Sequence, residues 1–234
     1  MKILKILLVI GSLVSIVGCG GGGGSSSNSN TITHNGVTYK TVKSPVTNRV
    51  WLDRNIGAAE VCTTYNDVAC YGDYFQWGRN PDGHEDSSSG VIATQATSIS
   101  NVGNSLFIKA GSTYKYDWAY SVDSTGVARN AQWSKTDASS VCPSGFRVPT
   151  LAELSAEVNG HINNRVDAFN SFLKLPSAGY RGADSLFIYV GDIGAYWSVD
   201  INGNKSNAGS FTPNSAYGTA VNRAIGASVR CIKN

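Results

Sequence analysis

Cysteine thiols are the groups in this sequence best able to form covalent bonds, and their positions limit which chemistry is open to them. Four of them follow residue 30: Cys62, Cys70, Cys142 and Cys231. A zinc site needs cysteines or histidines at short, regular spacings, but no C-x-x-C pair occurs and the three histidines are scattered. An even number of cysteines in an exported chain is typical of disulfides, so we predict two disulfides and no metal site.

Four cysteines can pair in three ways. We favour Cys62 with Cys70, which closes a short local loop, and Cys142 with Cys231, which closes a long one. On the chain-entropy account the long cross-link stabilises the folded state by ~4–5 kcal/mol, because it removes freedom from the unfolded chain.

The first 19 residues predict export. Lys2 and Lys5 precede an apolar run of 12 residues (6–17), which is shorter than the ~20 residues of a membrane-spanning helix and typical of a signal peptide. The run ends in the letters IVGC, which resemble the bacterial lipobox. The resemblance implies a signal peptide over 1–18 and lipidation of Cys19. The alternative is an ordinary signal peptide with an incidental cysteine.

Residues 19–30 contain only glycine, serine and asparagine after the cysteine. Such a tract is a flexible coil, with an r.m.s. reach of ~20 Å at this length. Two or three acyl chains on Cys19 would anchor the chain stably, so we expect this linker to hold a folded domain, residues 31–234, off a membrane. Position 20 is glycine rather than aspartate, which in Gram-negative lipoproteins implies the outer membrane.

The composition favours one loop-rich domain. Without the two lysines of the signal the chain is close to neutral and has no basic run, so nucleic-acid binding has little electrostatic support. Glycine, serine, asparagine and threonine are abundant. We therefore predict an α+β fold with small antiparallel sheets, one or two short helices and long loops.

Local patterns place the main elements. Strands are expected over 37–42, 49–53 and 228–232, so elements near both ends of the chain can pair. Thr150 and Glu153 form a capping box that begins a helix. Residues 80–112 and 200–220 are expected to be irregular loops that recognise a ligand.

Aromatic side chains are the best candidates for a binding surface, because tyrosine and tryptophan are flat and amphipathic. If residues 113–120 are extended, four aromatic side chains share one face: Tyr114, Tyr116, Trp118 and Tyr120. The alternative is that they pack in the core, as expected of Trp51, Trp77 and Trp197.

Catalytic motifs are missing from the sequence. It contains no G-x-S-x-G, H-E-x-x-H or P-loop. Five acids gather in the N-terminal third and could act in pairs as in a glycosidase: Asp53, Asp73, Asp82, Glu85 and Asp86. We favour the alternative, in which Asp53 and Asp73 bond neighbouring backbone, Arg54 or Arg79, the other three acids are solvated turn residues, and His84 is a solvated loop residue. We expect no catalysis and no cofactor.

Six segments follow one another between about residue 37 and residue 233: NRVWLDRNIGA, CYGDYFQWGR with NPDGHE, CPSGFRVPTLAEL, LKLPSAGYR, GAYWS and ASVRCI. Together they resemble the Fibrobacter succinogenes major paralogous domain. The resemblance implies a secreted or lipid-anchored bacterial surface protein.

The segment DASSVCPSGFRVPTLAEL also resembles the first helical region of C-type lectin-like domains. In that fold its cysteine bonds a cysteine of the last strand, which implies the same Cys142–Cys231 pair. The E-P-N, Q-P-D and W-N-D tripeptides that bind calcium in sugar-binding lectins do not occur. DINGN (200–204) begins like an EF-hand loop, but Lys205 and Phe211 replace the required glycine and glutamate.

The expected function is that of a lipid-anchored surface protein that binds or adheres to a glycan or a protein without catalysis. The alternatives are a structural envelope lipoprotein without a soluble ligand and an unrecognised enzyme.

Cys19→Ala should move the protein from the membrane fraction to the soluble fraction, because no acyl chain can then be attached. Cell fractionation followed by immunoblotting measures this. An unchanged membrane fraction would contradict the predicted anchor.

Overall fold

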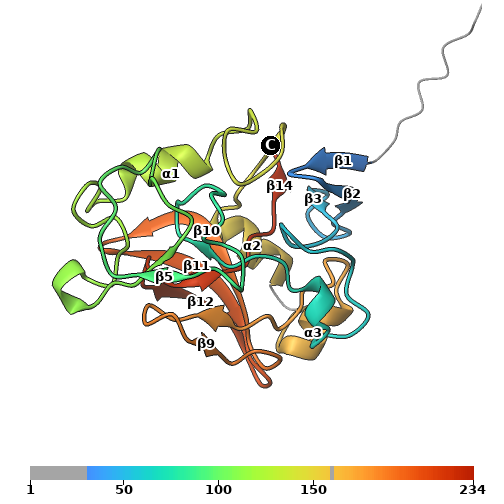
Figure 1. The fold of residues 1–234 in the computed structure, drawn as a ribbon. Helices are drawn as coiled ribbons and strands as arrows, with labels where there is room; N and C mark the ends of the chain where they lie inside the picture. The colour runs from blue at the N-terminus through green and yellow to red at the C-terminus, as the bar shows by residue number, and fades with distance from the viewer. Residues whose placement is uncertain (1–30, 159–160) are drawn as a thin grey trace, which may run out of the picture.

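A computed structural model describes residues 31–158 and 161–234 of the chain (Figure 1). The predicted signal peptide, Cys19 and the linker lie outside the described residues. The domain is mixed α+β, with several small antiparallel sheets and a few short helices joined by long loops. In the described part of the chain, no helix has the length and apolar character needed to span a membrane.

Most strands are short. They are β1 (Thr31–His34), β2 (Val37–Lys43), β3 (Val50–Leu52), β4 (Phe75–Gln76), β5 (Val91–Ile92), β6 (Phe107–Ile108), β7 (Phe146–Arg147), β8 (Tyr180–Arg181), β9 (Phe187–Ile188), β10 (Gly194–Asn202), β11 (Lys205–Phe211), β12 (Ala216–Val221), β13 (Gly226–Ala227) and β14 (Ile232–Lys233). The helices are α1 (Val127–Trp133), α2 (Leu151–Val158) and α3 (Arg165–Asn170), with 3₁₀ turns at Val68–Cys70 and Ser112–Tyr114.

One five-stranded sheet joins the two ends of the domain, in the order β1-β2-β3-β14-β7. Ile232 of β14 pairs with Trp51 of β3 on one side and with Arg147 of β7 on the other. The predicted pairing of strands near both ends is therefore confirmed. Trp51 and Ile232 are fully buried, so the closing strand is also part of the core.

Both predicted disulfides are present. The Cα atoms are 5.1 Å apart in Cys62–Cys70 and 5.9 Å apart in Cys142–Cys231, which is within the usual range for a disulfide. The second bond links the segment before β7 to the segment before β14, next to the pairing of these strands.

The predicted capping box of α2 is also present. The Glu153 N–H donates to the Thr150 hydroxyl (3.1 Å), and the Thr150 N–H donates to the Glu153 carboxylate (2.9 Å). Burial alone would raise the pKa of Glu153. The hydrogen bonds from Arg147 and the Thr150 N–H, with the charges of Arg147 and Arg49, outweigh burial and lower the pKa to about 2.

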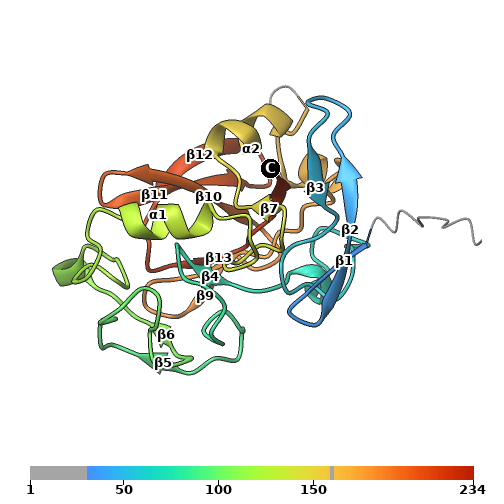
Figure 2. The same ribbon diagram turned by 90° about the horizontal axis from the view of Figure 1, so that it is seen from above.

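Two further sheets form the side of the domain away from β1: β10-β11-β12 and β4-β13-β8-β9 (Figures 1 and 2). Indole hydrogen bonds from two tryptophans join these sheets. Trp197 of β10 donates its indole N–H to the Phe75 carbonyl of β4 (2.7 Å), and Trp77 donates to the Ser198 carbonyl of β10 (2.9 Å). Trp51, Trp77 and Trp197 are all fully buried, as predicted.

The expectation of an irregular loop over 200–220 is wrong, because β10, β11 and β12 cover most of it. Residues 206–211 pair in continuous register with 216–221. The run of Ser, Asn, Ala and Gly has low strand propensity, but pairing with a longer neighbouring strand overrides that preference.

The extended conformation considered for residues 113–120 is also wrong. A 3₁₀ turn covers Ser112–Tyr114, and Lys115 and Tyr116 follow with φ angles of 51° and 55°. Asp117 then accepts the Ala119 N–H (3.0 Å). The local turn bonds break the alternation on which the prediction depended. The fold also has three α-helices where one or two were expected.

Replacing one disulfide or the other by two alanines should lower the free energy of unfolding by different amounts. Loss of Cys142–Cys231 should lower the free energy of unfolding by ~4–5 kcal/mol and loss of Cys62–Cys70 by ~2–3 kcal/mol, because the longer loop constrains the unfolded chain more. Urea denaturation of both double variants measures the two losses. Equal losses would contradict the chain-entropy explanation.

Candidate functional site

The acids and histidine of the 82–85 loop come together as if to hold a metal ion. One ligand atom from each of Asp82, His84 and Glu85 lies within 4.8 Å of the others. The expectation that His84 is solvated is wrong, since its side chain is fully buried.

The hydrogen bonds of His84 nevertheless fit a structural role better. Its Nε2 lies 3.1 Å from the Gln76 N–H, which can only donate, so Nε2 accepts and the ring proton is on Nδ1. Nδ1 then donates to Asp82 (2.8 Å) and has no free lone pair for a metal. Asp82 also pairs with Arg79 (2.8 Å), and Glu85 accepts the Gly83 N–H (2.9 Å).

The remaining acids differ in their partners. Asp53 bonds Arg54 (3.2 Å) and the Lys40 N–H (3.1 Å), as the alternative interpretation predicted. Asp73 does not pair with Arg79, which bonds Asp82 instead.

Asp73 has an unusual environment. Its carboxyl group packs against the backbone of Gly57, where a Cβ would clash with it and where φ is +80°. Burial, followed by the charges of Glu85 and Asp86, raises the pKa of Asp73 to about 7. The folded state therefore resists ionisation of this group.

The four aromatic residues proposed to share a face are separated by the fold. Trp118 is fully buried. It donates its indole N–H to the Trp77 carbonyl (2.8 Å). Tyr120 is half-buried, while Tyr114 and Tyr116 are exposed and line a separate hollow. Trp118 is therefore a core residue, and the set does not form one surface.

A different set of tyrosines surrounds a surface hollow that sequence analysis missed. Tyr180 of β8, Tyr189 of the loop after β9 and Tyr217 of β12 line a hollow of about 220 Å³, here called the tyrosine groove. The Tyr180 and Tyr189 ring centroids are 6.2 Å apart, and Tyr189 and Tyr217 are 55% and 47% exposed. Their rings are therefore open to a ligand.

Small side chains make the floor of the tyrosine groove. Ala195 pairs with Ser210, Ser210 with Tyr217, and Ala208 with Thr219. Residues directly opposite each other in an antiparallel sheet project to the same face. Because four of these five side chains are small, the sheet leaves a hollow beside the rings.

The phenol groups of the tyrosine groove are available for hydrogen bonding. The buried Tyr74 and Tyr196 use their hydroxyls on the Ala178 and Pro176 carbonyls (2.8 and 2.9 Å). Within residues 31–158 and 161–234, the hydroxyls of the three groove tyrosines have no such protein partner. Burial raises the pKa of the Tyr180 phenol, and Tyr189, Asp184 and Tyr217 add to the effect, so the Tyr180 phenol stays protonated.

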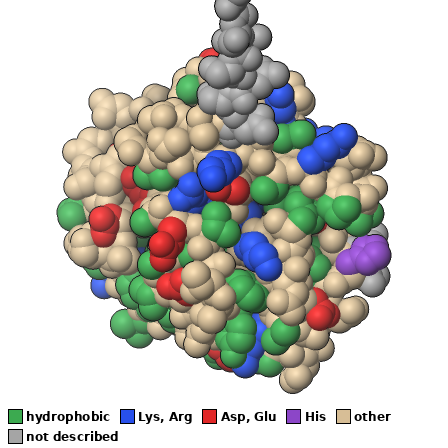
Figure 3. Space-filling model, turned by 90° about the vertical axis from the view of Figure 1, so that its right-hand side faces the viewer, with side chains coloured by type: hydrophobic (Ala, Val, Ile, Leu, Met, Phe, Trp, Pro, Cys, Tyr) green, Lys and Arg blue, Asp and Glu red, His purple; other side chains and the backbone are tan. Residues whose placement is uncertain are grey.

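Charge is excluded from the lining of the tyrosine groove. Among the described residues, no Asp, Glu, Lys or Arg side chain lines it. On another face of the domain, shown in Figure 3, basic and acidic side chains are interspersed with hydrophobic ones.

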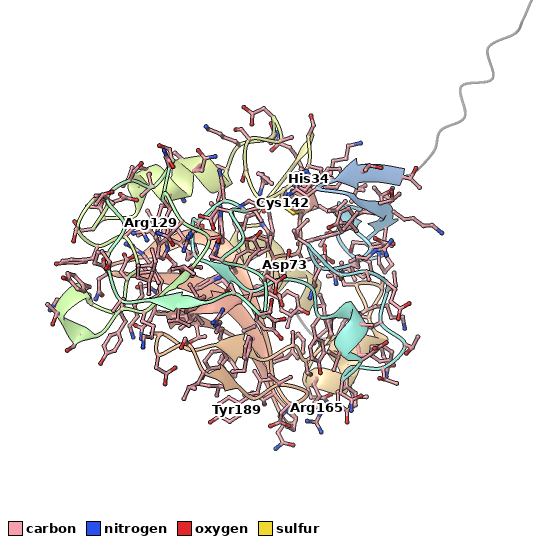
Figure 4. All side chains as sticks on the ribbon, viewed as in Figure 1. His34, Asp73, Arg129, Cys142, Arg165 and Tyr189 are labelled. Carbon is pink, nitrogen blue, oxygen red and sulfur yellow. A yellow bond between two sulfur atoms is a disulfide. The ribbon has the colours of Figure 1, made fainter. Side chains whose placement is uncertain are left out.

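The tyrosine groove lies far from the start of the domain. Figure 4 shows Tyr189 at the lower edge of the view and His34, from β1, near the top. In Figure 1, β9 and β1 are likewise on opposite sides of the domain. A domain held at its N-terminal end would therefore present the groove away from its anchor.

A weak sequence signal for this site exists in the letters SLFIYV, which end at Val190. These letters predict a strand, but the side chains of Leu186, Phe187, Tyr189 and Val190 are exposed. Several large apolar side chains exposed together favour an interaction site. The groove itself is lined by β8, β10, β11, β12 and the loop after β9, and no local pattern reveals how these segments come together.

Comparison with known proteins gives no match: no protein-family model, no curated protein and no solved structure is similar to the chain. No relative therefore supplies a ligand or a residue role.

Asp73→Asn should change how stability depends on pH. The folded pKa of about 7 lies above the ordinary value of 3.8, so the wild type loses stability as the pH rises from about 4 to about 7. The variant should lack this decline and melt at a higher temperature than the wild type at pH 8. Thermal melts from pH 4 to 8 measure both profiles.

Glu60→Gln is the control, because Glu60 is an exposed acid, and its profile should follow the wild type. Parallel profiles for Asp73→Asn and the wild type would contradict the raised pKa.

Proposed function

We propose that this chain is a lipid-anchored bacterial surface protein whose domain is a non-catalytic binding module for a glycan or a protein, with the tyrosine groove as its binding site. The observation that carries the proposal is the groove itself: three tyrosines with free hydroxyls around a hollow without charged lining. Tyrosine suits recognition because it combines a large apolar face with a polar group and few rotatable bonds.

The anchor supports surface display. The lipobox-like letters IVGC and the linker over 19–30 argue for attachment through Cys19, in the outer membrane if the organism is Gram-negative. Since β1 and the tyrosine groove are on opposite sides of the domain, attachment at the N-terminal end leaves the groove free.

We also infer membership of the Fibrobacter succinogenes major paralogous domain family, with a C-type lectin-like fold. The six ordered segments support this inference. So do the Cys142–Cys231 bond and the pairing of β14 with β3, which join the two ends of the domain.

Binding in the tyrosine groove should not need calcium. Within residues 31–158 and 161–234, no carboxylate lines it, and calcium binds through six to eight oxygen ligands that normally include carboxylates.

A structural envelope role is the second candidate. The exposed Val68, Phe187 and Val190 side chains line one hollow and offer a surface that a neighbouring envelope protein would cover, since apolar patches often mark such contacts.

Residues 25–234 should bind specific glycans on an array equally well with calcium and with a chelator. Tyr189→Ala should weaken that binding about tenfold or more, which corresponds to ~1.4 kcal/mol. Titration calorimetry with the ligand identified by the array measures the loss.

Tyr116→Ala is the matched control. Both tyrosines are exposed and both have a φ of 55°, so the two substitutions change the backbone equally. Binding lost in Tyr116→Ala and kept in Tyr189→Ala would contradict the proposed site.

A further inference from the structure

The tyrosine groove is too small to enclose a whole ligand. Pockets that enclose drug-sized molecules have volumes of ~300–1,000 Å³, whereas the groove measures about 220 Å³. It therefore suits one ring of a longer molecule, and the rest of that molecule must lie on neighbouring surface.

A second hollow lies directly beside the groove. It measures about 340 Å³ and is lined by residues that include Val68, Tyr71, Phe187 and Val190; it is here called the Phe187 hollow. The Phe187 ring packs edge-on against Tyr74, with centroids 5.1 Å apart. Like the groove, this hollow offers aromatic surface without charged lining among the described residues.

One backbone segment separates the two hollows. Tyr189 lines the groove, and the next residue, Val190, lines the Phe187 hollow. Consecutive Cα atoms are ~3.8 Å apart, so the two hollows meet at the backbone of residues 189–190. This backbone segment is here called the ridge, and the two hollows beside it are called its slopes. The left-handed φ of 55° at Tyr189 turns the chain at this point.

The ridge is held in place by the segment that precedes β8. The Gly179 N–H donates to the Ile193 carbonyl (2.7 Å), and the Gly191 N–H donates to the Ser177 carbonyl (2.8 Å). Gly179 has a φ of +67°, and a Cβ there would come within 2.5 Å of the Ile188 carbonyl oxygen. This close backbone approach fixes the position of the two hollows relative to each other, so less conformational entropy is lost when a ligand binds.

The chemistry of both slopes fits a neutral sugar. Sugar rings have C–H faces that stack on aromatic rings and hydroxyls that bond to phenols. Carboxylates flank both hollows without lining them. Asp184 adds to the raised pKa of Tyr180, and the exposed Asp86 precedes Ser87 of the Phe187 hollow. The guanidinium of Arg181 lies 5.4 Å from the Phe187 ring centroid but is buried and donates to the Ser89 and Ser185 carbonyls. Among the described residues no Lys or Arg side chain lines either hollow, so neither hollow offers a cation to an acidic sugar.

We infer, on the basis of the proposed function, that the ligand is a linear, neutral saccharide chain that lies across the ridge. One sugar ring occupies the tyrosine groove and another occupies the Phe187 hollow. The two slopes then act as linked subsites, so affinity grows with chain length until both are filled.

The test is calorimetry of residues 25–234 with neutral cello-, manno-, xylo- and chito-oligosaccharides of one to six units, and with oligogalacturonates as acidic counterparts. For the neutral series that binds, affinity should rise about tenfold or more between one and four units and then level off. Oligogalacturonates should bind more weakly at every length.

Substitutions in each hollow test which of the two binds the first sugar ring and which binds the next. Val190→Ser should abolish the gain with length while leaving the affinity for the shortest ligand that binds. Val122→Ser is the control, because Val122 and Val190 are 44% and 46% exposed, and it should behave as the wild type. Tyr189→Ala should weaken binding at every length.

Each failure has a distinct meaning. Binding that depends on Tyr189 but not on length overturns the chain inference and leaves the proposed function standing. A preference for oligogalacturonates overturns the neutral ligand. Binding of a protein, but of no saccharide, in a Tyr189-dependent manner overturns the saccharide inference alone. Saccharide binding unaffected by Tyr189→Ala overturns the inference together with the proposed site.

Discussion

Buried arginines satisfy the backbone of a domain built largely from loops. Long irregular segments leave many carbonyl groups without strand or helix partners, and a buried unsatisfied carbonyl is costly. Arg223, fully buried, donates to the carbonyls of Gly203 and Ser124 (2.8 and 3.0 Å) and to Asp117 (3.2 Å). Arg129 pairs with the same carboxylate (2.6 Å). Removing one partner of such a buried pair typically costs ~3–5 kcal/mol, so the loops depend on these ion pairs.

A third buried arginine satisfies backbone carbonyls beside the tyrosine groove. Arg181, buried beside Tyr180, donates to the carbonyls of Ser89 and Ser185 (2.9 and 3.2 Å). It therefore ties the β8–β9 hairpin to the loop before β5. Its guanidinium group also lies 5.4 Å from the Phe187 ring centroid. One side chain thus fixes both the hairpin that carries Tyr189 and the ring at the edge of the Phe187 hollow.

The parts of the fold that sequence predicts are those with local causes. The capping box needs only Thr150 and Glu153, and the short disulfide needs only cysteines eight residues apart. Trp118 could not be placed in this way, because its indole N–H bonds the Trp77 carbonyl, 41 residues earlier in the chain. The partner of His84, Gln76, is only eight residues away, but no local pattern indicates that the imidazole accepts that N–H. The tyrosine groove is harder still, since its hollow depends on strand register and on the absence of large side chains from one sheet face.

Ligand binding at the face around Tyr189 can be tested by a titration of ¹⁵N-labelled residues 25–234 with a neutral oligosaccharide, followed by backbone amide chemical shifts. The largest shifts should occur on both sides of the ridge, at residues 187–190, 180 and 217, while those at 114–116 should stay unchanged. Shifts centred on 114–116, or on the 82–85 loop, would contradict it.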